Sequence, residues 1–330
     1  MKQHSRRHFA AVALALAALT LSACVATPTP EPTDDGAPPE PITLRVQTGP
    51  VLFEGLLIGI EDGFFEDEGI TIEHSFTSNA TELIPQVVNG GVEISSANGF
   101  SVMNAVMQGI PIKAFAGLSN TAPEPVTNGI LVRADSGIDD YGDLAGKKIG
   151  VVDLRDSWEV GTREAVELAG EDPSTIEFIR LPLPNLNEAV LSGQVDAVYS
   201  LGVFWDLGLQ AGLVQLGSPV YEFLPGTPVG VWVASDAFIA EHPDVIERFN
   251  RAWALSVEAA NADPDRVREV RLDNSEADPD FVYRTPVVPF YAEIDEEGWQ
   301  HAIEVAEKHG MLDGPAPEVT DLIAAGAALK

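Results

Sequence analysis

A pattern that occurs twice in the chain places the strongest constraint on its fold. The two copies read NGGVEISSA at 89–97 and SGQVDAVYS at 192–200. In each copy an apolar helical stretch ends at an Asn-Gly or Ser-Gly pair, which suits the C-terminus of a helix, and a short β-rich run follows. Each copy therefore reads as the second half of a helix-to-strand unit.

Both copies also follow an earlier strand and helix. A strand over 43–49 and a helix over 54–65 are predicted before the first copy, and residues 147–153 and 157–170 repeat that order before the second. Strands and helices that alternate with short connections form mostly parallel sheets, whose ligands bind beyond the carboxyl ends of the strands. The predicted fold class is therefore α/β, with two similar lobes that face each other across a cleft.

The length and composition of the chain agree with two lobes. Its 330 residues are 45% hydrophobic and 7% aromatic, which is typical of a globular protein that can bury two ordinary cores. The formal net charge is −32. A nucleic-acid partner is excluded, because a phosphate backbone must be met by basic clusters that this chain lacks.

The first residues are predicted to be a signal peptide, residues 1–23. Lys2, Arg6 and Arg7 give a positive start, and the apolar run over 10–21 is too short to span a bilayer as a mature helix. The stretch SRRHF at 5–9 also resembles a twin-arginine export signal. The Sec route and the twin-arginine route both stay open as the route of export.

The single cysteine of the chain, Cys24, directly follows the signal peptide. The sequence LSAC at 21–24 resembles the lipobox of bacterial lipoproteins, which implies that the Cys24 thiol is acylated and holds the protein on a membrane. Residues 25–41 contain six prolines and are predicted to form a semi-rigid tether, so residues 24–41 lie before the fold, which begins near Ile42.

Four further segments carry a resemblance to a known family. Their order and spacing resemble the solute-binding proteins of ABC importers, in the subfamily for alkanesulfonates, taurine, nitrate and thiamine-pyrimidine precursors. The likeness runs from about Ile42 to the C-terminus, and the segments are GLLIGIEDGFFEDEGITIE (55–73), AVMQGIPIKAFAG (105–117), ILVRADSGIDDYGDLAGKKIGVVD (130–153) and LPLPNLNEAVLSGQVDAVYS (181–200).

The resemblance implies the type II periplasmic-binding-protein fold, in which a second lobe interrupts the first and two crossing strands form the hinge. It assigns residues 42–133 and 229–330 to lobe one and residues 134–228 to lobe two, with 128–133 and 229–235 as the crossing strands. It also implies a monomer whose partners are a small-molecule ligand, an ABC permease and its ATPase.

An enzyme is not predicted. Eukaryotic thiamine-pyrimidine synthases share the resemblance, but their family carries a cysteine-rich motif linked to iron, and this chain has only Cys24. A G-x-S-x-G motif is missing, and GDLAGK at 142–147 is one residue short of a P-loop. His301 and His309 are expected on an exposed helix face. No catalytic residue, metal or cofactor is therefore predicted.

Ligand-binding residues are expected where strands end and helices begin. The resemblance places a small polar residue at the start of a lobe-two helix, which Ser157 matches, while Asp156 and Glu159 have the spacing of a capping box. Core packing for the aromatic residues, a helix cap for Asp156 and turn formation for the asparagines are the alternatives. The candidates are Phe53, Glu54, Asn79, Asn98, Phe100 and Asn120 in lobe one, and Asp156, Ser157, Trp158, Tyr199, Phe204 and Trp205 in lobe two.

The same residues predict the character of the ligand. Asp153, Asp156 and Glu159 crowd the lobe-two helix start, where an anion would need free backbone N–H groups. The aromatic candidates suit the faces of a ring. A neutral or cationic aromatic or heteroaromatic ligand, such as an aminopyrimidine or a substituted benzene amide, is therefore expected. An anionic alkanesulfonate, taurine or nitrate stays open, and so does a receptor that reports to a membrane sensor.

Overall fold

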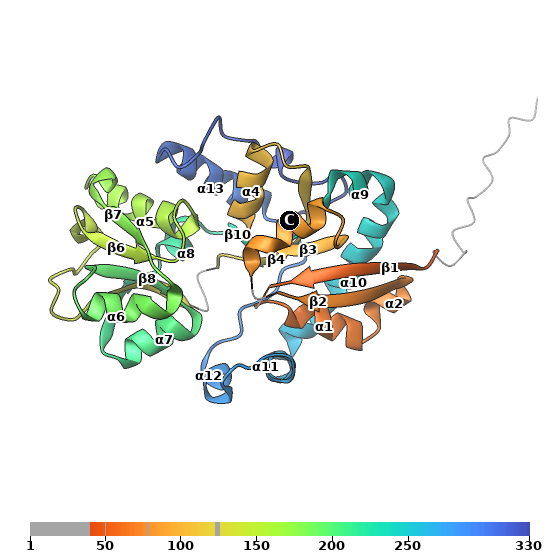
Figure 1. Ribbon diagram of the computed structural model, residues 1–330, viewed down its shortest axis with the longest axis horizontal. Coiled ribbons are helices and arrows are strands. Elements are labelled where there is room, and N and C mark those ends of the chain that lie inside the picture. Colours follow the sequence, from red (N-terminus) through yellow and green to blue (C-terminus); the bar gives the residue numbers. More distant parts are fainter. Residues whose placement is uncertain (1–39, 50, 78, 123–125) are drawn as a thin grey trace, which may run out of the picture. The chain divides into compact units, whose positions relative to one another are not determined.

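The computed structural model describes residues 40–49, 51–77, 79–122 and 126–330, which form two five-stranded sheets with helices around them (Figure 1). The predicted signal peptide, the lipidation of Cys24 and nearly all of the tether lie outside the described residues. Among the described residues, no helix combines the length and the apolar character needed to cross a membrane.

The first sheet has the strand order β2-β1-β3-β10-β4. The neighbours β1–β2 and β1–β3 run parallel, whereas β10 runs antiparallel to both β3 and β4. Its strands are β1 (Ile42–Thr48), β2 (Ile70–Phe76), β3 (Ile94–Ala97), β4 (Ile112–Asn120) and β10 (Pro228–Ser235).

The second sheet repeats this plan with the order β7-β6-β8-β5-β9. The strand β6 runs parallel to β7 and β8, whereas β5 runs antiparallel to β8 and β9. Its strands are β5 (Asn128–Arg133), β6 (Lys148–Val151), β7 (Glu177–Arg180), β8 (Ala197–Leu201) and β9 (Leu213–Gly217). The prediction of an α/β fold with two lobes of mostly parallel strands is confirmed.

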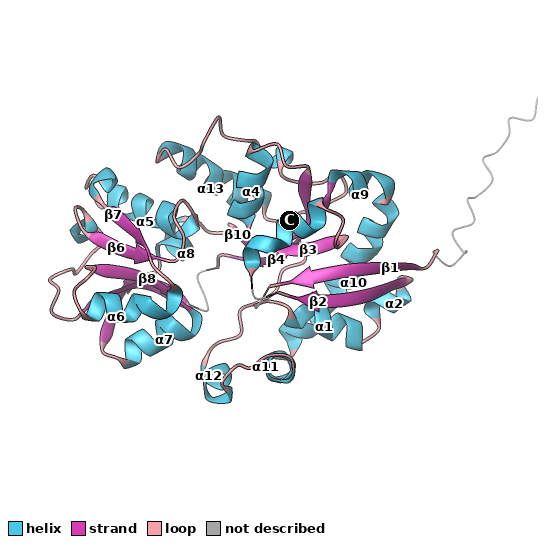
Figure 2. Cartoon of the chain, viewed as in Figure 1, coloured by secondary structure: helices cyan, strands magenta, loops and turns pink. Residues whose placement is uncertain are grey.

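Helices fill the connections in both lobes (Figure 2). Those around the second sheet are α5 (Ser157–Leu168), α6 (Leu186–Leu191), α7 (Gly202–Gln210) and α8 (Pro219–Phe223). The others are α1 (Glu54–Glu61), α2 (Phe64–Asp67), α3 (Leu83–Val88), α4 (Gly99–Met107), α9 (Asp236–Glu241), α10 (Pro243–Ala262), α11 (Pro264–Asp273), α12 (Pro279–Arg284) and α13 (Glu296–Lys308).

The repeated sequence pattern occupies the same place in each lobe. The helices α3 and α6 end just before Gly90 and Gly193, whose φ angles of 69° and 76° lie in the left-handed region that glycine adopts without a steric penalty. The chain then enters β3 or β8, and each of these strands is third in the order of its sheet. In each sheet the repeat therefore forms the central strand, and the antiparallel strand of that sheet pairs with it.

Helix α10 packs its apolar side against the first sheet. Its buried apolar residues recur every three or four positions, which gives the helix one apolar side. On that side Trp253 lies 5.3 Å from Trp232 of β10 and Phe249 lies 5.6 Å from the same ring, measured between ring centroids. Trp232 is fully buried, so it belongs to the core of the first lobe.

Two segments connect the sheets, residues 121–127 and 218–227. They meet where Thr121 N–H donates to the Thr227 carbonyl oxygen (2.9 Å) and Gly226 N–H donates to the Thr121 carbonyl oxygen (3.0 Å). The resemblance had assigned residues 128–133 to lobe one, but β5 is hydrogen-bonded into the second sheet only. The chain therefore crosses between the lobes before β5 and again before β10, because β5 pairs only with strands of the second sheet and β10 only with strands of the first.

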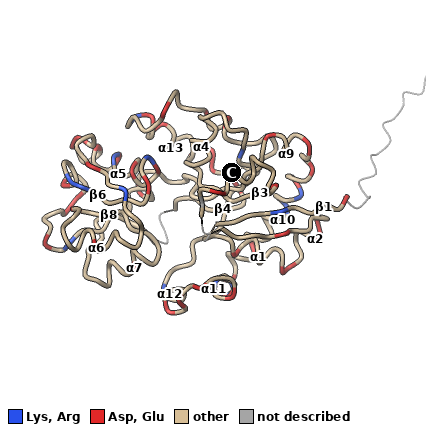
Figure 3. The backbone as a smooth tube through the Cα atoms, viewed as in Figure 1, with Lys and Arg blue, Asp and Glu red and all other residues tan. Residues whose placement is uncertain are grey.

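Acidic residues are spread over both lobes (Figure 3). This distribution agrees with the net charge of −32 and favours solubility.

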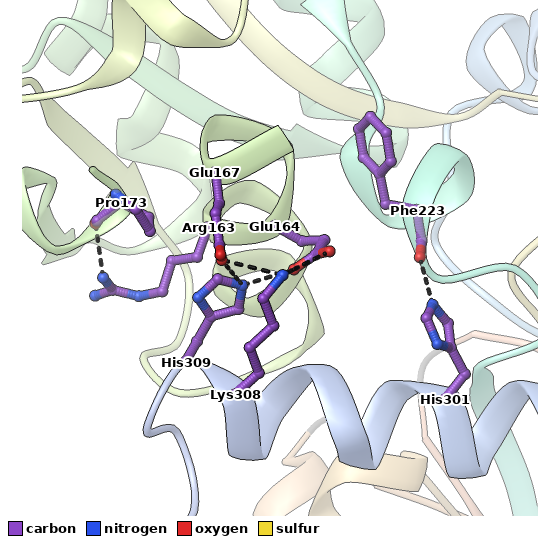
Figure 4. A network of polar contacts seen from close by, with 8 residues as sticks. All are labelled: Arg163, Glu164, Glu167, Pro173, Phe223, His301, Lys308 and His309. Atoms are coloured by element: carbon purple, nitrogen blue, oxygen red, sulfur yellow. Dashed lines mark hydrogen bonds and ion pairs between the residues drawn. The ribbon is translucent and has the colours of Figure 1, made fainter. Parts of the chain in front are cut away.

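Helix α13 contacts the second lobe, although residues 229–330 had been assigned to lobe one. Lys308 Nζ lies 2.8 Å from Glu164 Oε2 and 3.1 Å from Glu167 Oε2 of α5, and His309 Nε2 lies 2.8 Å from Glu164 Oε2 (Figure 4). The His309 side chain is only 5% exposed, so the expectation of a solvated face was wrong for it. His301, by contrast, is exposed and contacts the Phe223 carbonyl oxygen at 3.0 Å.

This cluster generates a stability prediction. Burial opposes the ionisation of Glu164, but the hydrogen bonds from Lys308 and His309 outweigh it and lower the pKa of that carboxyl. Lys308→Met removes one partner of a mostly buried carboxylate and should lower the free energy of unfolding by about 1–2 kcal/mol at pH 7. The stabilisation is present above the ordinary pKa of 4.5 and is lost as the pH falls through the lowered value.

Urea unfolding at pH 7 and at pH 3.5 measures this effect. Lys148→Met is the matched control, because Lys148 and Glu177 form a 3.5 Å pair in which both side chains are more than half exposed. Equal losses for the two variants at pH 7, or a loss for Lys308→Met that does not shrink in acid, would contradict the prediction.

Candidate functional site

The carboxyl ends of the parallel strands in both sheets lie at the connections between the lobes. The segment 121–127 leaves the end of β4 and enters β5 beside the end of β8, because β5 is antiparallel to β8. The return segment 218–227 leaves the end of β9 and enters β10 beside the end of β3. Both connections thus join the two sheet edges at which α/β proteins bind ligands.

Two strained residues stand at equivalent positions on these edges. Leu52 has a φ of 64° and Arg155 a φ of 60°, and they are the non-glycine residues with positive φ among the described part of the chain. Leu52 lies between β1 and α1, and Arg155 lies between β6 and α5. Strained backbone costs on the order of 1–3 kcal/mol per residue and is concentrated at ligand-binding sites. The strain therefore marks the same strand-to-helix turn in each lobe.

The turn in lobe one differs from its prediction at Glu54. This carboxylate is completely buried at the start of α1 and forms an ion pair with Arg271 of α11. Its charge is balanced within the protein, so Glu54 adds no free negative charge to a ligand. Phe53, the residue just before α1, is 2% exposed, so its side chain packs inside lobe one and supports the turn.

Three other lobe-one candidates hold local structure. Asn98 caps α4 by accepting from Phe100 N–H at 2.9 Å, and its amide nitrogen donates to the Val229 carbonyl oxygen at 3.2 Å. Phe100 is 3% exposed and packs in the core. Asn79 is exposed, and its amide oxygen accepts from Thr81 N–H at 3.3 Å. These contacts agree with the alternative of turn formers and core residues.

Asn120 is a lobe-one candidate with unused hydrogen-bonding capacity, as is Glu54, whose buried Oε2 also has no hydrogen-bond partner in the described part of the chain. Asn120 ends β4, is 7% exposed, and its buried Oδ1 has no hydrogen-bond partner among the described residues. A buried amide oxygen without a partner is costly unless a ligand or water satisfies it. Asn120 therefore stays a ligand-binding candidate.

The start of α5 is capped by Asp156, but the predicted capping box is only half formed, because the Glu159 side chain bonds to Arg155 instead of Asp156. Asp156 accepts from Trp158 N–H at 3.0 Å and from Glu159 N–H at 3.3 Å, and the Glu159 carboxylate accepts from Arg155 N–H at 2.9 Å. Ser157, the first residue of α5, is 5% exposed. Because Asp156 already occupies these N–H donors, the helix start offers little to an anion.

The Asp156 carboxyl group is itself perturbed. Burial, followed by the negative charges of Asp153 and Glu159, raises its pKa to about 7, although the hydrogen bonds from Trp158 and Glu159 oppose the rise. Glu159 also forms an ion pair with Arg163, whose Nη2 lies 2.7 Å from Glu159 Oε1. Asp156 thus changes charge near neutral pH.

An aromatic pair follows the cap in lobe two. Trp158 lies with its ring centroid 4.9 Å from that of Tyr199, at an interplanar angle of 37°. Tyr199 is 1% exposed and donates its hydroxyl to Asn128 Oδ1 at 2.7 Å, whereas Trp158 is only partly buried. The buried Tyr199 ring therefore packs against one side of Trp158 and holds it in place.

The α7 candidates divide into two roles. Phe204 is partly buried near the start of the helix, and its carbonyl oxygen accepts from Asn187. Trp205 packs against the apolar cluster between α6 and the second sheet. Its indole nitrogen is buried without a hydrogen-bond partner among the described residues.

Phe76 is a residue that the sequence did not identify. It ends β2, is 49% exposed, and meets the Phe53 ring edge-on with centroids 6.0 Å apart. The run ITIEHSF reads only as a half-buried strand, so its last residue gave no signal of a special role. The structure places it at the carboxyl edge of the first sheet, opposite Thr48.

A hollow of about 1070 Å³ lies beside the segments that connect the lobes. Asn120 is in its wall together with Thr121 and Gly226, and the remaining wall comes from α10, α13 and the residues around 289–298. Its wall carries the acidic residues Glu293, Asp295, Glu296 and Glu297, of which Asp295 is paired with Lys330 at 2.7 Å. This hollow includes one predicted ligand residue, Asn120, and lacks the aromatic candidates.

The chain is similar to two proteins whose names refer to pyrimidines. It is 23% identical over 278 residues to the formylaminopyrimidine-binding protein of Halalkalibacterium halodurans. This match covers 79% of this chain and 82% of the relative. It is 27% identical over 205 residues to the 4-amino-5-hydroxymethyl-2-methylpyrimidine phosphate synthase of Schizosaccharomyces pombe. That match covers 58% of this chain and 56% of the synthase.

Solved structures share the fold at low sequence identity. The aliphatic sulphonate binding protein SsuA of Escherichia coli superposes with a TM-score of 0.71 at 14% identity, covering 87% of this chain and 98% of SsuA. A Candida albicans protein described as having the generic periplasmic binding protein fold gives a TM-score of 0.64 at 16% identity, covering 88% and 98%. The fold is thus that of periplasmic binding proteins. Residues 52–267 match the family described as NMT1/THI5 like, and the chain belongs to that family.

Proposed function

We propose that this protein is an extracytoplasmic solute-binding protein that captures a neutral or cationic aromatic or heteroaromatic molecule between its two sheet edges and delivers it to an ABC permease and its ATPase. The observation that carries the proposal is the pair of strained turns at Leu52 and Arg155. Each turn stands at the carboxyl edge of its own lobe, so a ligand between the edges would touch both.

The chemistry of the edges favours a ring over an anion. Trp158 is held against Tyr199 with part of its surface free, and Phe76 is half exposed in lobe one. Asp156 fills the helix N–H groups that an anion would need. The name of the formylaminopyrimidine-binding relative supports a ligand of the aminopyrimidine class.

Capture is favoured over synthesis. The fungal relatives are named as synthases, but the chain spans 56% of the length of the S. pombe enzyme. Its sequence holds a single cysteine, Cys24, directly after the predicted signal peptide, whereas the resemblance ties the synthases to a cysteine-rich motif. The proposed protein therefore binds its ligand without converting it.

The proposal includes attachment to a membrane. Acylation of Cys24 after export by the Sec or twin-arginine route would hold the protein at the outer face of the cell membrane, and the proline-rich residues 25–41 would let the lobes reach a permease. The binding unit would act as a monomer.

A binding experiment tests the proposed function. 4-Amino-5-hydroxymethyl-2-methylpyrimidine or N-formylaminopyrimidine should raise the melting temperature by several degrees, since a ligand at one hundred times its Kd adds about 2.7 kcal/mol. Trp158→Ala should weaken binding about tenfold or more, and Tyr283→Ala, which removes a 56% exposed ring on α12, is the control. Stabilisation by taurine, an alkanesulfonate or nitrate, with no response to ring compounds, would refute the proposed ligand class.

The raised pKa of Asp156 gives a second prediction. Its folded-state stabilisation is fully present below the ordinary pKa of 3.8 and is lost as the pH rises through about 7. Asp156→Asn keeps a capping oxygen but removes the ionisation. The melting temperature of the variant relative to the native chain should therefore increase between pH 5.5 and pH 8.5. A difference that stays constant over this range would show that Asp156 has an ordinary pKa.

A further inference from the structure

Phe76 borders a cavity that the candidate residues do not account for. The cavity has a volume of about 510 Å³, which is within the usual range of small-molecule sites, and its wall consists of Phe76, Asn274, Ser275 and Glu276. Phe76 contributes an aromatic ring from the end of β2, and the other three residues form the loop between α11 and α12. An aromatic surface and polar groups thus converge on one cavity.

The polar groups of the cavity are partly used by the loop itself. The Asn274 amide nitrogen donates to the Val270 carbonyl oxygen at 2.9 Å, and Ser275 Oγ donates to the Arg271 carbonyl oxygen at 2.6 Å. These bonds fix the loop on the end of α11. The Glu276 carboxylate is exposed and takes part in no ion pair or hydrogen bond with the described residues, so it is available to a ligand.

The loop is held at both ends. Arg271 of α11 forms an ion pair with the buried Glu54 at the strained turn of lobe one. Arg284 of α12 lies 3.1 Å from Asp206 on α7, which belongs to the second lobe. The segment that lines the cavity, from α11 to α12, is therefore tied both to the carboxyl edge of the first sheet and to α7, the helix that carries Phe204.

We propose that Phe76, Glu276 and Asn274 form the lobe-one half of the ligand site, specific for a planar nitrogen heterocycle that carries an amino group. The inference rests on the proposed function and deepens it. The ring of the ligand packs on Phe76, its amino group donates to the Glu276 carboxylate, and the Asn274 amide oxygen accepts a further hydrogen bond. A carboxylate acceptor favours a donor such as an amino group over a carbonyl substituent and stabilises a protonated ring.

Isothermal titration with 4-amino-5-hydroxymethyl-2-methylpyrimidine tests the site. Phe76→Ala and Phe76→Leu should each raise Kd about tenfold, because both remove the ring while Leu keeps apolar packing against Phe53. Glu276→Gln should raise Kd about fivefold and reduce the preference for this compound over its analogue without the 4-amino group. The analogue reports on the amino group itself, which a loss of structure would not.

Two matched controls separate this site from general surface effects. Leu255→Ala removes an apolar side chain of 47% exposure on α10, and Glu307→Gln removes an exposed carboxylate on α13; both should keep Kd within about twofold. If the native chain binds the pyrimidine but the Phe76 and Glu276 variants bind equally well, the inference is overturned and the proposed function stands. If the native chain binds no ring compound, both are overturned.

Discussion

The backbone pairing of Thr121 with Thr227 is the contact on which the candidate site depends. Both residues are buried where the two connections between the sheets meet, and Thr121 Oγ1 also accepts from Thr227 N–H at 2.9 Å. The pairing brings the end of β4 next to the start of β10, and β5 begins shortly after on the other side. As a result the carboxyl edges of both sheets, with their strained turns, are joined by short segments of chain.

The two-lobe plan could be predicted from the sequence because it depends on local signals. The helix end at Gly90 or Gly193 and the β-rich run that follows are readable residue by residue, and the structure places both at the same step of their sheets. The capping role of Asp156 was also readable, since a side-chain oxygen before a helix satisfies the first free N–H groups. The two crossings of the chain, before β5 and before β10, were not readable in this way and were expected only from the family resemblance, because strand pairing over such a distance leaves no local trace.

Partners far apart in sequence explain the remaining differences. Glu54 was named as a ligand-binding candidate, but its buried carboxylate forms an ion pair with Arg271, which lies more than two hundred residues further along the chain. His309 looked solvated because the helix around it is polar, yet α5 supplies Glu164 and Glu167 as its neighbours. Phe76 had no signal at all, since its exposure results from where β2 ends in the sheet.

The central claim is that an aromatic or heteroaromatic ligand lies between the carboxyl edges of the two sheets. Hydrogen–deuterium exchange of the full mature chain, with and without a saturating aminopyrimidine, tests this most directly. The account predicts slower exchange in both lobes, at residues 152–158 and 199–204 and at residues 74–77 and 272–276. Slower exchange confined to residues 289–298, beside the hollow of about 1070 Å³, would contradict it.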